Sequence, residues 1–286
     1  MGLMTNPNLN TLVIPASDLN ALKAAGFTAP TPTKKKTPRI TVATRGKTKN
    51  GKSHWALMTT PEPIGYLMLD PGALELSQKA VNRGRKIFPK YIEHSKKAEQ
   101  EAAKVLWGEY RKAWRAIMAT KSIRTLVVDT IDEAWELIQM AEFGKVKQNN
   151  KYAYGPLNAE FGGLIEEAYY SRPDLNIVLI QKVKKEYVGD NWDGKSMKPA
   201  GFGTLDYLVD LSISHYFKEK KFGFTTLANE ATRFGPQFAG LDFFDEENSF
   251  TDLALHIFKE HPDYDAVGAD PEYWDPLYFK KLEAAS

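Results

Sequence analysis

The sequence contains no cysteine among its 286 residues, which excludes disulfides, thiolate metal sites and thiol nucleophiles. No apolar run approaches the ~18 residues needed to span a bilayer. The first residues lack the basic-then-apolar pattern of a signal peptide, and the few histidines are too scattered to indicate a metal cluster. We therefore expect a soluble, cytoplasmic protein that does not contact a membrane.

Charge is unevenly distributed along the chain, although the net charge is only +2. The stretch from Lys79 to Lys121 is rich in lysine and arginine, whereas acidic residues outnumber lysines in residues 241–286. This separation suggests a polyanion-binding face and an acidic tail. Two solvated helical surfaces are the alternative interpretation.

A phosphate-binding motif occupies residues 46–53. Glycines in such a loop let backbone N–H groups approach phosphate oxygens closely. The lysine reaches the β- and γ-phosphates, and the serine offers its hydroxyl to Mg²⁺. A strand at residues 40–44 is predicted before the loop, and a helix at residues 53–59 after it. The motif therefore predicts binding of ATP with Mg²⁺, and it reads Gly46-Lys47-Thr48-Lys49-Asn50-Gly51-Lys52-Ser53.

Three further predicted strands end in a polar residue, at Asp70, Asp129 and Gln181. Because the carboxyl ends of parallel strands line the ligand crevice, these side chains are expected to converge on the nucleotide. Asp129 is the expected Walker B acid and would hold Mg²⁺ opposite Ser53. Gln181 would sense the γ-phosphate or position water. A strand-end cap is the alternative for Asp70 and Gln181.

The alternation of strands and helices predicts an α/β fold with a mostly parallel central sheet flanked by helices. Residues 72–120 are interpreted as helical with a break near Pro89, and residues 211–226 as a β-hairpin added after the core. We divide the chain into three parts. These are an N-terminal arm and linker (1–38), an ATPase core with a basic helical insertion at 73–121 (39–240), and an acidic C-terminal tail (241–286).

Three motifs accompany these strands, and together they resemble a known family. They are Tyr152-Ala153-Tyr154-Gly155-Pro156-Leu157-Asn158, Lys198-Pro199-Ala200-Gly201-Phe202-Gly203 and Leu205-Asp206-Tyr207-Leu208-Val209-Asp210. With the Walker A loop and the strand-end acids, they are similar to phage P-loop ATPases with a RecA-like core, including short recombinases that assist single-strand annealing. The resemblance covers about residues 39–235. It implies ATP, Mg²⁺, single-stranded DNA, and assembly into a homo-oligomeric ring or filament.

The family would place DNA-binding loops after the third and fourth strands of the core. Lysines among aromatic residues suit such loops, since lysines contact phosphates and aromatic rings stack on bases. Surface hairpins whose aromatic residues pack back on the sheet are the alternative. The candidate DNA-binding residues are Lys145, Lys147 and Tyr152 in the first loop, and Trp192, Lys195 and Lys198 in the second.

The catalytic machinery departs from the family pattern. RecA-like proteins place a glutamate just past the second strand, but here Pro71 and Gly72 follow Asp70, and the next acid is Glu75. Asp70 or Glu75 would polarise the attacking water, with Asp132 and Glu133 as further candidates. Arg233 would act across a subunit interface as an arginine finger, a role for which Lys182 and Lys184 compete.

These features predict a Mg²⁺-dependent ATPase, slow or stimulated by DNA, that binds single-stranded DNA and supports phage-type recombination or annealing. A phage annealing or single-strand-binding protein is an expected partner, and the host cytoplasm the expected location. One alternative is an ATPase with the same core that serves protein assembly or DNA packaging without binding DNA. Another is a nucleotide-binding regulator with negligible turnover.

Overall fold

The computed structural model describes residues 24–25, 35–93, 99–146, 150–186, 197–227, 233–259, 261 and 263–276. Residues 36–286 form one compact unit and residues 1–35 another. The strands of the larger unit are β1 (Thr41–Arg45), β2 (Ile64–Met68), β3 (Ile87–Tyr91), β4 (Thr125–Asp129), β5 (Asn176–Ile180), β6 (Val183–Lys185), β7 (Met197–Pro199), β8 (Leu211–Lys218), β9 (Lys221–Thr226) and β10 (Asp242–Phe244). The helices are α2 (Lys52–Thr59), α3 (Gly72–Asn82), α4 (Gln100–Ala119), α5 (Ile131–Phe143), α6 (Tyr154–Ser171), α7 (Phe250–Phe258) and α8 (Pro271–Trp274).

An eight-stranded sheet with the order β10-β9-β8-β1-β5-β4-β2-β3 forms the centre of the larger unit. The strands from β8 to β3 in this order are parallel, and β9 and β10 add antiparallel strands at one side. Met68 pairs with Asp129, and Asp129 with Ile180. The predicted α/β fold with a mostly parallel central sheet and added C-terminal strands is confirmed.

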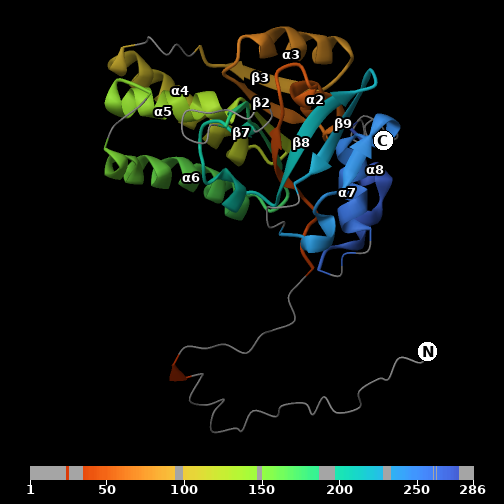
Figure 1. The fold of residues 1–286 in the computed structure, drawn as a ribbon. Coiled ribbons are helices and arrows are strands. Elements are labelled where there is room, and N and C mark those ends of the chain that lie inside the picture. Colours follow the sequence, from red (N-terminus) through yellow and green to blue (C-terminus); the bar gives the residue numbers. More distant parts are fainter. Residues whose placement is uncertain are drawn as a thin grey trace, which may run out of the picture. The chain divides into compact units, whose positions relative to one another are not determined.

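Helices cover both faces of this sheet (Figure 1). Adjacent residues of β4 show how the sheet separates two cores: Leu126 and Val128 join the core beneath α4, α5 and α6, and Val127 joins the one beneath α2, α3 and α7. Strands buried on both faces explain the continuous apolar runs in the sequence. Within the described residues, no helix is long and apolar enough to cross a membrane.

The region predicted to be helical from residue 72 to 120 contains a strand, which corrects that expectation. β3 pairs in parallel with β2 and is the edge strand of the sheet, and Pro89 stands at its centre opposite Tyr66. Proline removes a backbone donor, so within sheets it is tolerated mainly at an edge, where one side of the strand makes no sheet hydrogen bonds. The sequence analysis interpreted this proline as a helix break.

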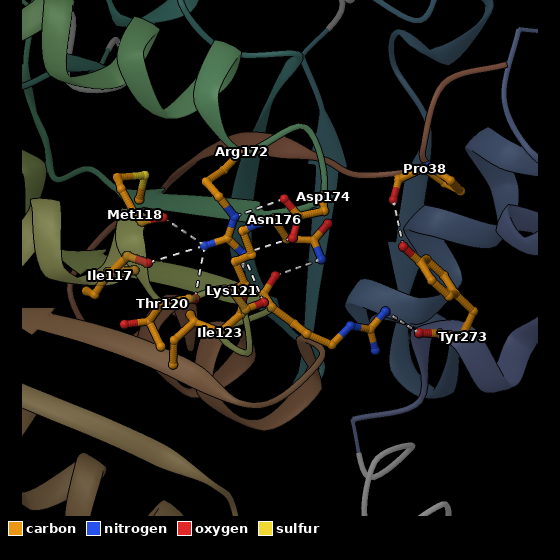
Figure 2. A network of polar contacts seen from close by, with 11 residues as sticks. Pro38, Ile117, Met118, Thr120, Lys121, Ile123, Arg172, Asp174, Asn176 and Tyr273 are labelled. Carbon is orange, nitrogen blue, oxygen red and sulfur yellow. Dashed lines mark hydrogen bonds and ion pairs between the residues drawn. The ribbon is translucent and has the colours of Figure 1, made fainter. Parts of the chain in front are cut away.

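A buried arginine holds the end of α4 against the start of β5 (Figure 2). The last carbonyl groups of a helix have no partner within the helix. Arg172, which is 4% exposed, donates to the carbonyl oxygens of Ile117 and Met118, both at 3.3 Å. It also forms an ion pair with Asp174 at 2.9 Å. Whereas the phosphate loop follows the carboxyl end of β1, this network lies just before the amino ends of β4 and β5. Its other acceptors are the carbonyls of Thr120, Lys121 and Ile123.

The described part of the predicted acidic tail packs on the core. α7 begins with a capping box formed by Ser249 and Asp252, which satisfies backbone donors at the helix start. Phe250 and Trp274 are fully buried, and the Trp274 ring stacks on Phe258 at 5.3 Å. Trp274 therefore belongs to the hydrophobic core.

Candidate functional site

The phosphate loop connects β1 to α2, as the sequence predicts. Its glycines are required by backbone geometry, because Gly46 and Gly51 adopt φ values of 145° and 84°. A Cβ atom on Gly46 would lie 2.7 Å from the carbonyl oxygen of His215. Asn50 ties the loop to the same carbonyl, to which its side-chain amide donates at 3.0 Å. The loop is thus held against β8 by contacts that only small side chains permit.

Lys52, the first residue of α2, lies across this loop. Its ammonium group donates to the carbonyl oxygens of Gly46 at 2.9 Å and Lys47 at 3.0 Å. Burial lowers the pKa of Lys52, and the charges of Asp129 and Asp132 oppose that shift. The positive charge is therefore held at the loop, where it can neutralise a bound phosphate.

The two predicted Mg²⁺ ligands lie side by side. Asp129 is 3% exposed and accepts a hydrogen bond from the hydroxyl of Tyr66 at 2.7 Å. Burial raises the pKa of Asp129, and the neighbouring hydroxyls of Ser53 and Tyr66 oppose the rise. A carboxylate and a hydroxyl suit Mg²⁺, which usually takes one or two protein oxygens and completes its shell with phosphate and water. Among the described residues, no cluster of three or more His, Asp or Glu could hold a metal alone.

Asp70 lies beside this pair, at the carboxyl end of β2. The backbone N–H of Asp70 donates to the carbonyl oxygen of Asp129 at 3.2 Å. Its carboxylate accepts from the N–H of Gly72 at 2.9 Å and pairs with Lys182 at 3.1 Å. Burial opposes ionisation, but these two partners outweigh it and hold the pKa of Asp70 below its usual value. Asp70 is therefore ionised and oriented.

Lys182 bridges two candidate catalytic acids. Its ammonium group lies 2.6 Å from Glu133 as well as 3.1 Å from Asp70. Burial alone would lower the pKa of Lys182, but the two carboxylates raise it. The charge of Lys182 also lowers the pKa of Lys52, so the two lysines share one electrostatic environment. Lys182 thus compensates the charge of both acids next to the phosphate loop.

Asp132 is a buried acid poised to titrate near neutral pH. Its Oδ2 accepts the backbone N–H of Lys182 at 2.6 Å, and its Oδ1 has no hydrogen-bond partner. Burial raises its pKa to about 7, opposed by Lys182 and assisted by the charges of Glu133 and Glu136. Gly201 packs against it, since a Cβ there would lie 2.8 Å from Oδ1. Asp132 can therefore gain and lose a proton at working pH.

Gln181 follows β5 at the predicted strand end and is fully buried. Its amide oxygen accepts from Arg45 Nε at 2.8 Å, and its amide nitrogen donates to the carbonyl of Ala200 at 2.6 Å. Ala200 in turn donates to the carbonyl of Lys182 at 2.9 Å. Gln181 therefore connects the end of the phosphate-loop strand to the β6–β7 hairpin, a link that the sequence did not indicate.

Glu75 and Arg233, the other predicted catalytic residues, lie away from this cluster. Glu75 is exposed in the first turn of α3, where a hydrogen bond from Lys79 lowers its pKa. The guanidinium of Arg233 lies 4.5 Å from the ring of Tyr169, and its backbone N–H donates to Asp210. Asp210 precedes β8 and accepts the backbone N–H of Thr41 at the amino end of the parallel strand β1, whereas the phosphate loop follows the carboxyl end of β1. Arg233 is thus about one strand length, roughly 15 Å, from the loop of its own chain.

The predicted DNA-binding residues are only partly described. Lys145 is exposed after α5, Tyr152 is 92% exposed just before α6, and Lys198 is half-buried in β7. Lys147, Trp192 and Lys195 lie outside the described residues. Phe202, which belongs to the motif that begins at Lys198, is 2% exposed and packs on Trp135 and Phe161. Its ring belongs to the core.

Two functional contacts were not predicted from sequence. Tyr66 bonds Asp129 from the neighbouring strand, and the β8–β9 hairpin packs on the phosphate loop through His215 and Phe222. Tyr66 lies inside an apolar strand, a position at which the sequence indicates an ordinary core residue. Its register partner in β4 is Val127, and Asp129 lies two residues further along on the same face of the sheet, so the contact depends on the strand pairing.

A complete phosphate loop facing a strand-end acid, on a mostly parallel α/β sheet, defines a P-loop NTPase. The sequence profile of the AAA domain family (AAA_24) matches residues 39–260, and the chain belongs to this family. No curated protein matches it.

Two solved structures are similar. The RadB recombinase shares 13% identity at a TM-score of 0.44, covering 73% of this chain and 87% of that one. The flagellar accessory protein FlaH from Methanocaldococcus jannaschii shares 9% identity at a TM-score of 0.35, covering 73% and 85%.

Proposed function

We propose that this protein binds ATP with Mg²⁺ and hydrolyses it. The observation that carries the proposal is the phosphate loop with the ammonium group of Lys52 bonded across it, next to the buried carboxylate of Asp129, whose charge acts on Lys52. The loop N–H groups and Lys52 would bind the phosphates, and Ser53 and Asp129 would hold Mg²⁺, which when bound neutralises charge on the phosphates. Asp70, fixed by Gly72 and Lys182, would orient and polarise water.

We further infer that nucleotide binding controls a single-stranded DNA-binding surface. Gln181 supports this coupling, since it contacts both Arg45 before the phosphate loop and Ala200 after β7. The β6–β7 hairpin carries the second predicted DNA loop, with Lys198 within it. Tyr152, almost fully exposed, offers a ring on which a base can stack.

A labelled oligonucleotide titrated at about 50 and 200 mM salt, with and without Mg·ATP, tests DNA binding. Neutralising about three phosphates predicts a roughly 20-fold loss of affinity across this salt range. Tyr152→Ala should weaken binding about tenfold through loss of stacking. Tyr170→Ala is the matched control, because this tyrosine is 79% exposed at the other end of α6. Absence of binding at low salt, with and without ATP, contradicts the proposal.

The cellular role that we propose is phage-type homologous recombination or strand annealing by a homo-oligomeric ring or filament. A phage annealing or single-strand-binding protein would be the partner. The location of Arg233 supports assembly in one respect: it lies too far from its own phosphate loop to act there, so a finger role requires a neighbouring subunit. Sedimentation with and without ATP and DNA measures this assembly.

A second candidate, a nucleotide-gated regulator with negligible turnover, is favoured by Lys182. Its ion pairs with Asp70 and Glu133 occupy two of the four candidate acids that could polarise water. Turnover that rises with single-stranded DNA would exclude this candidate, and ATP binding without measurable phosphate release would support it.

A further inference from the structure

A small cavity adjoins the phosphate loop between α2 and the β8–β9 hairpin. It has a volume of about 150 Å³, and Gly51 and His54 at the start of α2 form part of its lining. Phe222 of β9 forms another wall, close enough to Gly51 that a Cβ there would lie 3.0 Å from its ring. The amide of Asn248 donates to the backbone carbonyl of Phe222 at 2.7 Å and thereby holds this wall.

Two buried nitrogen atoms of the cavity lining lack partners. Trp55 Nε1 and His215 Nε2 make no hydrogen bond to any described residue, and each residue is 4% exposed. The two rings meet edge-on at a centroid distance of 5.3 Å. Leaving a buried polar atom without a partner is unfavourable, so native proteins rarely retain one without a ligand or water to satisfy it.

The cavity is suited to an uncharged ring. Burial, assisted by the charge of Lys52, lowers the pKa of His215 to about 3, so its imidazole is neutral. Among the described residues, the cavity lining includes no carboxylate, lysine or arginine. An apolar protein cavity of about 150 Å³ accommodates one aromatic ring such as benzene.

We propose that this cavity binds the nucleobase of the nucleoside triphosphate whose phosphates occupy the loop. This inference rests on the proposed ATP-binding function, and it adds the chemical group that distinguishes ATP from other polyphosphates. The ring of Phe222 packs against the base, and the indole N–H of Trp55 donates to a nitrogen or oxygen of the base. Nε2 of His215 forms a second hydrogen bond to the base. His54 connects this cavity to the phosphate loop through the first turn of α2.

Calorimetric titration of Mg·ATP and Mg·tripolyphosphate into the full chain tests the proposal. The wild type should bind ATP at least tenfold more tightly than tripolyphosphate. Trp55→Phe, which retains a ring but removes the N–H, and Phe222→Ala should each weaken ATP binding about tenfold and change tripolyphosphate binding less than twofold. Phe88→Ala, whose ring is 56% exposed on the edge strand β3, is the matched control and should change neither.

Indole NMR signals provide a second readout, with Trp55→Phe assigning the signal of Trp55. ATP should shift this signal, and tripolyphosphate should leave it in place. Equal affinity of the wild type for both ligands overturns the base pocket while leaving phosphate binding intact. Equal weakening of both ligands by the two variants also overturns it, because the damage then lies in the loop. If the wild type binds neither ligand, the proposed function fails as well.

Discussion

The most exacting prediction concerns the pH dependence of stability and the buried carboxyl of Asp132. Asp132→Asn keeps the shape of the side chain, and an amide oxygen can still accept the N–H of Lys182, now bonded at 2.6 Å. The substitution removes the titrating group. Charged groups near it are Lys182, which favours ionisation, and Glu133 and Glu136, which oppose it.

The sign follows from the shift of the pKa of Asp132 from 3.8 to about 7 on folding. The native protein retains a proton that the unfolded chain releases, so stability falls as pH rises from 3.8 to about 7. At 1.36 kcal/mol per pH unit, the loss across this window is about 4 kcal/mol. Between pH 5 and pH 8 it is about 3 kcal/mol.

Urea unfolding of wild type and Asp132→Asn at pH 5 and pH 8 measures this effect. The variant should gain about 3 kcal/mol relative to wild type between these two pH values. Any constant cost of the new amide cancels from this difference. Asp174→Asn is a control of opposite sign: burial opposes its ionisation, but Arg172 outweighs burial and lowers the pKa of Asp174. A stability difference between Asp132→Asn and wild type that does not change with pH would refute the reasoning.

Three further predictions concern the fold, the catalytic acids and the assembly. Arg172→Met should reduce stability by about 3–5 kcal/mol in thermal or urea unfolding, because several buried carbonyls lose their donor. Arg115→Met, on the exposed face of α4, should change stability by about 0.5 kcal/mol or less. Lys182→Met should lower ATP turnover at neutral pH about tenfold or more, because the nearby carboxylates lose a compensating charge. For the same reason the acidic limb of the pH–rate profile should move to higher pH. An unchanged profile contradicts the positioning role of Lys182. Mixing Arg233→Ala with Lys52→Ala should partly restore turnover if Arg233 completes a neighbour's site, and absence of rescue refutes the finger role.

Sequence reasoning succeeded where a signal is local. The phosphate loop has a fixed spacing, β4 ends at Asp129 as predicted, and the hairpin predicted at residues 211–226 is formed by β8 and β9 within those bounds. A strand-end acid after an apolar run was enough to find Asp129. Because β2 and β4 are neighbouring parallel strands, Asp70 and Asp129 lie together at the carboxyl ends of these strands.

Features that depend on distant segments were not accessible. Lys182 contacts Asp70 and Glu133 across 112 and 49 positions of sequence, and no pattern encodes such pairs. The edge strand β3 was missed because Pro89 reads as a helix break when its neighbours in the sheet are unknown. Phe202 sits among glycines, which resembles an exposed loop, yet its ring fills the core beside Trp135.

Calorimetric titration of ATP into wild type and Lys52→Ala, with and without Mg²⁺, tests the central claim most directly. The wild type should bind ATP more tightly when Mg²⁺ is present, because Ser53 and Asp129 then contribute through the metal. Asp129→Asn should lose this Mg²⁺-dependent gain, and Lys52→Ala should lose ATP binding. Undiminished ATP affinity of Lys52→Ala would contradict the assignment of residues 46–53 as the nucleotide site.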